Sequence, residues 1–201
     1  MIAIIDYGMG NIHSVEKALS LFRVETIVTN QKKDIASAEK LVLPGVGAFD
    51  DAMRELENQG LVSVLKDEIK KKKPFLGICL GMQLLFQRSE EAKEARGLGV
   101  LKGEVKKFLP KNGLKVPHMG WNTITKAAAC PLLKDLPDNA YVYFCHSYYP
   151  LPAKEAVAAT TDYGLNFASA VWQANVYGVQ FHPEKSQKTG LKIIENFVHL
   201  C

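Results

Sequence analysis

The chain has 201 residues, which is enough for one domain with a substantial hydrophobic core. Its 47% hydrophobic and 23% charged residues are ordinary for a globular enzyme, and no apolar stretch reaches the roughly 20 residues that a membrane span requires. The net charge of +4 comes largely from the lysines at 70–73. We interpret these lysines as a solvated helix end rather than a nucleic-acid site, because no aromatic residues lie among them.

The cysteines exclude two further classes of protein. None of them shows the paired spacing that binds zinc, so we expect no metal; they are Cys79, Cys130, Cys145 and Cys201. Residues 1–5 are too short a run for a signal peptide, and a chain of this size has little need of a disulfide framework. The sequence therefore predicts a reduced, cytoplasmic protein that binds neither membrane nor nucleic acid.

Short apolar runs alternate with amphipathic stretches in the first half of the chain. The strands that these runs predict lie at 2–5, 24–29, 41–43 and 75–78. Helical spacing of apolar residues is found at 12–22, 50–57 and 61–70. This order is typical of a parallel sheet with right-handed crossovers, in which reactive groups collect at the carboxyl ends of the strands.

The second half has the character of an antiparallel sheet. Its short β-type runs lie at 100–101, 104–108, 123–125, 141–145, 157–161, 168–172 and 176–181, and a helix closes the chain. We therefore expect an α/β fold, a single domain over residues 1–201. Its central sheet should be mostly parallel and flanked by helices, with additional antiparallel strands in the second half.

A cysteine between two glycines follows the strand predicted at 75–78. The sequence Gly77-Ile78-Cys79-Leu80-Gly81 has the pattern of a nucleophile elbow, a sharp strand-to-helix turn, with cysteine in place of serine. The glycines leave room for a strained backbone, and the N-terminus of the following helix favours the thiolate of Cys79. A packed turn with a buried structural cysteine is the alternative.

A candidate base for Cys79 lies far downstream. His182 is followed two positions later by Glu184, a carboxylate that can orient the imidazole and stabilise its charged form. Pro183 biases His182 toward an extended backbone, in which alternate residues share a face. These residues predict a Cys-His-Glu catalytic triad.

The loop at 44–49 supplies a candidate oxyanion hole. Gly45 and Gly47 allow a backbone N–H to turn toward a ligand, and the N–H of Leu80 is its natural partner. A phosphate-binding loop is the alternative, but the segment lacks the Lys-Ser/Thr ending of a P-loop and the third glycine of a dinucleotide fingerprint.

Three motifs together resemble the class I glutamine amidotransferases in order and spacing. They are Pro-Gly-Val-Gly at 44–47, Gly-Ile-Cys-Leu-Gly-Met-Gln at 77–83 and His-Pro-Glu at 182–184. Within that superfamily, three segments resemble the glutaminase subunits of imidazole glycerol phosphate synthases, which act in histidine biosynthesis. These segments lie at 6–11, 117–122 and 181–186.

The resemblance implies a glutaminase that needs no cofactor. Cys79 attacks the side-chain carboxamide of glutamine, His182 passes a proton to the leaving ammonia, and Glu184 keeps the imidazole oriented. Hydrolysis of the resulting thioester then gives glutamate. The backbone N–H groups implied for the oxyanion hole belong to Val46, Gly47 and Leu80. The residues implied for glutamine binding are Gln83, Ser147 and Tyr148.

The resemblance also implies a heterodimer. In that family the ammonia passes to a cyclase subunit, a (βα)8 barrel that makes imidazole glycerol phosphate and an aminoimidazole carboxamide ribonucleotide. A barrel takes about 250 residues, so we expect the cyclase to be a separate chain. Glutaminase activity in the family is low until the cyclase binds its ligand, and rotation of the peptide at 45–47 is the switch we expect. The residues implied to face the partner are Met9, Asn11, Met119, Trp121, Tyr143 and Lys185.

Two other classes stay open at this point. One is an amidotransferase subunit of another pathway, such as anthranilate, aminodeoxychorismate or pyridoxal phosphate synthesis, against which the segment 117–122 and Lys185-Ser186 speak. The other is a protein of the same architecture with a redox-sensing cysteine, for which His182 and Glu184 are unnecessary. Among the remaining histidines, His146 is the one expected to line the site.

Overall fold

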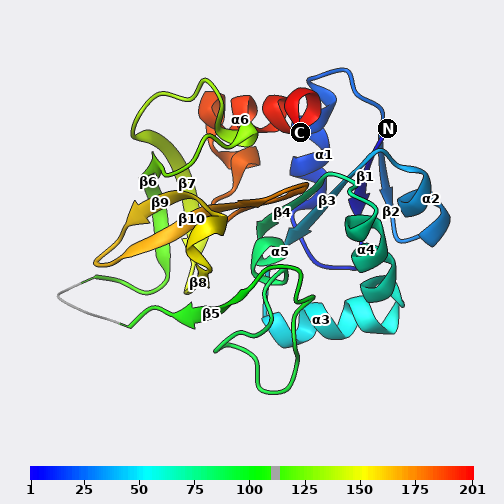
Figure 1. Ribbon diagram of the computed structural model, residues 1–201, viewed down its shortest axis with the longest axis horizontal. Helices are drawn as coiled ribbons and strands as arrows, with labels where there is room; N and C mark the ends of the chain where they lie inside the picture. The colour runs from blue at the N-terminus through cyan, green and yellow to red at the C-terminus, as the bar shows by residue number, and fades with distance from the viewer. Residues whose placement is uncertain (110–113) are drawn as a thin grey trace.

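The computed structural model describes residues 1–109 and 114–201 and has a nine-stranded sheet with helices on both faces (Figure 1). The strands of this sheet are β1 (Ile2–Ile5), β2 (Thr26–Thr29), β3 (Lys40–Gly45), β4 (Phe75–Cys79), β6 (His118–Lys126), β7 (Ala140–His146), β9 (Val157–Asp162), β10 (Asn166–Gln173) and β11 (Val176–Val179). They lie side by side in the order β2-β1-β3-β4-β11-β10-β9-β6-β7. A separate antiparallel pair joins β5 (Gly103–Lys107) to β8 (Tyr148–Pro152).

The pairing changes from parallel to antiparallel at β11. From β2 to β11 every neighbouring pair is parallel, and from β11 to β7 every pair is antiparallel. The predicted α/β fold is confirmed. That its two halves form one continuous sheet is a further finding, because β11, near the end of the chain, inserts between β4 and β10. Val179 consequently lies opposite Ile78, and the loops that follow β4 and β11 leave the sheet at the same edge.

Helices cover the two faces of the parallel strands. They are α1 (Ile12–Ser20), α2 (Lys32–Ser37), α3 (Phe49–Asn58), α4 (Leu61–Lys70), α5 (Leu80–Gln83) and α6 (Gln187–Leu200). Ile2 and Ile4 pack in one core with residues of α1 and α6, whereas Ala3 and Ile5 pack in the other with residues of α2, α3 and α4 (Figure 1). Burial on both faces explains why these strands read as continuous apolar runs. Within the described residues, none of the helices has the length and apolar character needed to cross a membrane.

The structure differs from the predicted elements at three places: one predicted strand is absent, and one helix and one strand are present that the sequence did not predict. The run at 100–101 is not a strand, because the N–H groups of Val100 and Leu101 both donate to the Leu85 carbonyl oxygen, at 2.9 and 3.0 Å. Helix α2 was not expected, since Ile35 is its one buried residue and gives no periodic pattern. Strand β8 was not expected either, because its sequence Tyr-Tyr-Pro-Leu-Pro contains two prolines.

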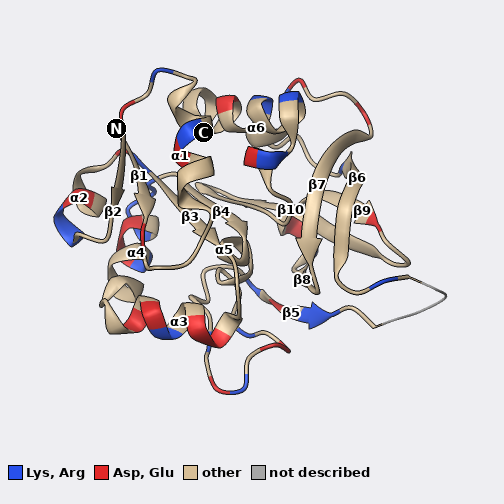
Figure 2. Cartoon of the chain, turned by 180° about the vertical axis from the view of Figure 1, so that it is seen from behind, with Lys and Arg blue, Asp and Glu red and all other residues tan. Residues whose placement is uncertain are grey.

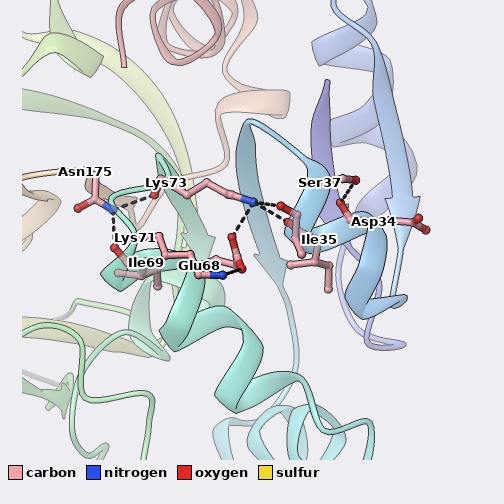
Figure 3. A network of polar contacts seen from close by, with 9 residues as sticks. Asp34, Ile35, Ser37, Glu68, Ile69, Lys71, Lys73 and Asn175 are labelled. Carbon is pink, nitrogen blue, oxygen red and sulfur yellow. Dashed lines mark hydrogen bonds and ion pairs between the residues drawn. The ribbon is translucent and has the colours of Figure 1, made fainter.

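The lysine run before β4 is only in part a solvated helix end. Lys70 is exposed, but the side chain of Lys73 is 10% exposed and pairs at 2.8 Å with the buried Glu68 (Figure 3). Lys73 Nζ also donates to the carbonyl oxygens of Ile35 and Ala36, at 2.8 and 2.7 Å, so that it ties the end of α4 to α2.

Helices α2 and α3 each carry charged side chains of both signs (Figure 2).

We expect Glu68→Gln to lower the free energy of unfolding by about 3 kcal/mol, because it leaves the Lys73 ammonium buried without a counter-charge. The matched control is Asp67→Asn, which removes an exposed pair with Lys70 at 3.7 Å and should change stability by less than about 0.5 kcal/mol. Urea unfolding of both variants measures the difference. If both variants lowered the free energy of unfolding by the same small amount, the result would contradict a structural role for the pair of Glu68 and Lys73.

Candidate active site

Cys79 ends β4 in a strained backbone conformation. Its φ of 55° and ψ of −113° lie outside the regions that residues with side chains prefer, and such strain clusters at functional sites. Turn α5 follows at once and crosses close to β3, so that a Cβ at Gly81 would overlap the Leu43 carbonyl oxygen. A Cβ at Gly77 would lie 2.6 Å from the Gly81 carbonyl oxygen. The packing of the elbow therefore excludes a side chain at either glycine.

Helix α5 is a single turn of four residues, shorter than the pattern after Cys79 indicated. It ends where the hydrogen bonds tighten, because the N–H groups of Leu85 and Phe86 donate to residues three positions earlier, Met82 and Gln83, at 3.1 Å each. Only one turn of helix dipole is available to the sulfur, and the dipole's effect is correspondingly limited. Most of the electrostatic support for a thiolate must come from a neighbouring side chain.

His182 lies between β11 and the short helix η3 (Pro183–Lys185), at the sheet edge where β4 also ends. Its Nδ1 lies 2.9 Å from Glu184 Oε1, and both side chains are almost fully buried. Ser186 holds this loop in place. Its Oγ accepts a hydrogen bond from the N–H of Tyr143 at 3.0 Å and donates one to the His182 carbonyl oxygen at 2.6 Å.

The charge of His182 depends on its two partners. Burial alone would lower the pKa of His182, but hydrogen bonds and charge attraction from Cys79 and Glu184 outweigh desolvation and raise it to about 10. An imidazolium beside the sulfur favours the thiolate, the nucleophilic form of cysteine. The arrangement supports covalent catalysis with one group that both donates and accepts a proton.

A cavity of about 340 Å³ opens over Cys79. It is lined by Val46, Gly47, Cys79, Leu80, Gln83, Glu91, Pro117, Cys145, His146, Ser147, Tyr148, His182 and Lys185. The structure thus brings together all the residues that the sequence assigns to the nucleophile, the base, the oxyanion hole and glutamine binding, with Glu184 behind His182. His146, the one other histidine expected to line the site, is among them.

Gln180 is a buried polar residue of the site that sequence reasoning missed. Its Nε2 lies 3.8 Å from Cys79 Sγ, and its Oε1 accepts a hydrogen bond from Gln83 Nε2 at 3.0 Å. Gln180 precedes His182 by two positions in an extended segment, so the alternation of faces in a strand could have identified it.

Glu91 was also missed, and no sequence signal marks it. It belongs to the charged stretch 90–96, which is typical of a surface, yet this residue lines the cavity. The carboxylate accepts a hydrogen bond from the N–H of Phe49 at 3.0 Å, and burial raises its pKa.

Most of the residues predicted to face a partner cover the surface beside the cavity. In the β6–β7 hairpin, Met119 and Trp121 are 60% and 46% exposed, and Trp121 pairs across the strands with Tyr143. The rings of Trp121 and Tyr143 meet edge to face with centroids 6.0 Å apart, and Lys185 Nζ lies 6.0 Å from the Tyr143 ring.

Met9 and Asn11 lie closer to the site itself. Asn11 Nδ2 donates to Glu184 Oε1 at 3.4 Å, and Met9 packs against Gly47. Among residues 1–109 and 114–201, no group of three or more His, Cys, Asp or Glu side chains is arranged to hold a metal ion.

The fold and this site agree with a known class of protein. The family model for class I glutamine amidotransferases matches residues 3–201, and the chain belongs to this family. It is 53% identical over 197 residues to imidazole glycerol phosphate synthase subunit HisH of Bacillus cereus strain B4264, with 98% of this chain and 93% of the relative covered. The HisH subunit of Aquifex aeolicus is 53% identical over 196 residues, with 96% and 94% covered. The structure of PurLQS from Thermotoga maritima shares the fold, with a TM-score of 0.74, 17% identity and coverage of 98% of this chain and 96% of that chain.

We expect the His182 imidazole to titrate near pH 10, which NMR of its ring protons measures. Cys79→Ala should lower the pKa of His182 by about 1–3 pH units, because it removes the charge and hydrogen bond of the sulfur. Cys130→Ala, which removes a buried thiol, is the control and should leave the midpoint in place. The pKa of His182 in the folded protein lies above its value of about 6.5 in the unfolded chain, so the charged imidazole stabilises the folded state. This contribution to the free energy of unfolding is complete below pH 6.5 and is lost as pH rises toward 10. A wild-type midpoint near 6.5 would contradict this.

Proposed function

We propose that this chain is the glutaminase subunit of an imidazole glycerol phosphate synthase. It hydrolyses glutamine to glutamate and ammonia, and it supplies the ammonia to a cyclase subunit in histidine biosynthesis. The observation that carries this proposal is the alignment of a strained Cys79 with His182 and Glu184 at one cavity. Its specificity rests on relatives of that name that are 53% identical over nearly the whole chain.

The chemistry runs in two steps at one sulfur atom. The Cys79 thiolate attacks the side-chain carbonyl carbon of glutamine, the His182 imidazolium gives its proton to the nitrogen, and ammonia leaves as the C–N bond breaks. Neutral His182 then removes a proton from water, the water oxygen attacks the thioester, and glutamate leaves with the thiolate restored. Glu184 holds the proton on Nδ1 of His182, so that Nε2 carries out each transfer.

Two backbone donors stabilise the oxyanion in this proposal. The N–H of Leu80 follows the nucleophile directly, and the peptide of Val46 and Gly47 lines the same cavity. Gly47 has a φ of 95°, which glycine adopts without strain, so rotation of this peptide can switch the site on when the cyclase binds its ligand. Tyr7 anchors the start of the loop, because its hydroxyl donates to the Pro44 carbonyl oxygen at 3.0 Å.

Other residues that line the same cavity account for glutamine binding. We assign it to Gln83 and to the main chain of Ser147 and Tyr148, which Gln83 already contacts through a 3.0 Å hydrogen bond to the Tyr148 carbonyl oxygen. Glu91 adds a carboxylate to the same cavity. A carboxylate there complements the ammonium group of an amino acid and favours glutamine over simple amides.

The cyclase subunit would cover the surface beside the cavity. Exposed Met119 and Trp121, with Tyr143, present the aromatic and methionine side chains that are enriched in interface cores. Lys185 lines the cavity and lies against Tyr143, so this surface is continuous with the site where ammonia forms. We therefore expect the ammonia to pass directly to the partner at this surface.

The release of ammonia and glutamate from glutamine tests this function, for the chain alone and for its mixture with a cyclase subunit and that subunit's nucleotide ligand. We expect strong stimulation by the liganded cyclase, because the oxyanion donor is completed only in the complex. Cys79→Ala should abolish the activity, and Cys130→Ala should retain it.

The other outcomes are equally informative. Activity that the cyclase does not change would keep the glutaminase chemistry but assign the chain to another amidotransferase system. Absence of ammonia and glutamate release in every mixture would overturn the proposal and leave a redox or binding role for Cys79.

A further inference from the structure

A pair of buried histidines, of which His146 lines the substrate cavity, takes no part in the chemistry above. His118 and His146 are cross-strand partners in β6 and β7, and they are 3% and 6% exposed. Nδ1 of His118 lies 3.0 Å from Nε2 of His146. Nδ1 of His146 lies 2.8 Å from the carbonyl oxygen of Tyr148. The imidazole of His118 therefore contacts that of His146, and His146 in turn contacts the main-chain carbonyl of Tyr148 in the substrate cavity.

The partners determine where the ring protons lie. A carbonyl oxygen only accepts, so Nδ1 of His146 must carry hydrogen, and in a neutral ring its Nε2 is then bare. The unprotonated Nε2 of His146 accepts a hydrogen bond from Nδ1–H of His118. In neutral His118, Nε2 then carries no hydrogen either and is an acceptor. Asn122 Nδ2, 3.4 Å away, is the donor to it. The hydrogen bonds thus run in one direction, from Asn122 through both histidines to Tyr148.

The surroundings keep both rings neutral and oriented. Burial lowers the pKa of His118 to about 4 and that of His146 to about 3, and the positive charge of His182 adds to the effect at His146. His118 lies between the rings of Phe144 and Tyr163, with centroids 4.7 and 3.9 Å away and planes within 24° and 22° of parallel. These aromatic faces exclude water and fix the plane of the imidazole, while its hydrogen bonds to His146 and Asn122 set which edge faces each partner.

The Tyr148 carbonyl oxygen is the last acceptor of these hydrogen bonds, and Tyr148 lines the substrate cavity. It accepts from His146 and also from Gln83 Nε2 at 3.0 Å. Without a donor at His118, Nε2 of His146 would be a buried, unsatisfied acceptor, and moving the proton to that nitrogen would only leave an unsatisfied donor there and a bare Nδ1 facing the Tyr148 carbonyl oxygen. The imidazole of His146 would no longer be held at both nitrogens, and its hydrogen bond to Tyr148 would weaken.

We propose that His118 and His146 are positioning residues for glutamine, a neutral pair that holds the main chain at Ser147 and Tyr148 in the geometry that binds the substrate. This inference rests on the proposed glutaminase function. The pair acts on substrate affinity, not on the proton transfers at His182.

Two variants of His118 separate hydrogen bonding from packing. His118→Phe keeps a flat ring between the two aromatic faces but has no donor, whereas His118→Asn loses the ring but keeps an N–H near the position of Nδ1. In the complex with the liganded cyclase, we expect His118→Phe to raise the KM for glutamine about three- to tenfold, with kcat within about twofold of wild type. His118→Asn should have a KM closer to wild type although it melts at a lower temperature.

A role in packing alone predicts the opposite order, with KM following the melting temperature, and that result would overturn the proposal. His199→Phe and His199→Asn, at an exposed position, are the matched controls. Unchanged KM in every variant of an active complex would refute the inference and leave the proposed function standing. Absence of glutaminase activity in the wild-type complex would overturn both.

The unsubstituted chain offers a second test that does not depend on folding of a variant. Nitrogen NMR of the histidine rings distinguishes the two neutral tautomers from the imidazolium. We expect His118 and His146 to be neutral at pH 6 with the proton on Nδ1 in both rings. A proton on Nε2 of His146, or a charged ring at that pH, would refute the arrangement.

Discussion

The close crossing of turn α5 past β3 and β4 is the constraint on which the rest of the site depends. It leaves no room for a side chain at Gly77 or Gly81, and it forces Cys79 into a conformation that costs about 1–3 kcal/mol. The parallel strands on either side are buried on both faces and stabilise that strain. Because Cys79 ends a strand and precedes a helical turn, its sulfur is held at the sheet edge where the loops after β3 and β11 meet.

Three buried histidines around this edge show how neighbours decide charge. His182 is buried beside a carboxylate and a sulfur, and its pKa is raised to about 10. His118 and His146 are buried beside amide, carbonyl and aromatic groups, and their pKa values are lowered to about 4 and 3. One residue type is therefore charged at one position and neutral at the other two, because desolvation is outweighed only where an anion is in contact.

The parts of this structure that the sequence predicts are those with a local signal. Apolar runs identify β1 and β4, and the glycines around Cys79 indicate the elbow, because strand burial and backbone crowding act on neighbouring residues. The insertion of β11 beside β4 has no local signal, since its partners lie far away in the chain. Lys73 and Glu91 mislead for a related reason: each belongs to a charged stretch typical of a surface. Only the tertiary contact with Glu68 or with Phe49 shows that its side chain is partly withdrawn from solvent.

The central claim is that strain and charge make Cys79 the nucleophile for glutamine. Mass spectrometry after treatment with a diazo-ketone analogue of glutamine, in the presence and absence of the liganded cyclase, tests it most directly. Cys145 lines the same cavity and serves as an internal control. We expect a single adduct at Cys79 that excess glutamine suppresses, with Cys145 unmodified. An adduct at Cys145 instead, or no adduct at Cys79 under either condition, would contradict it.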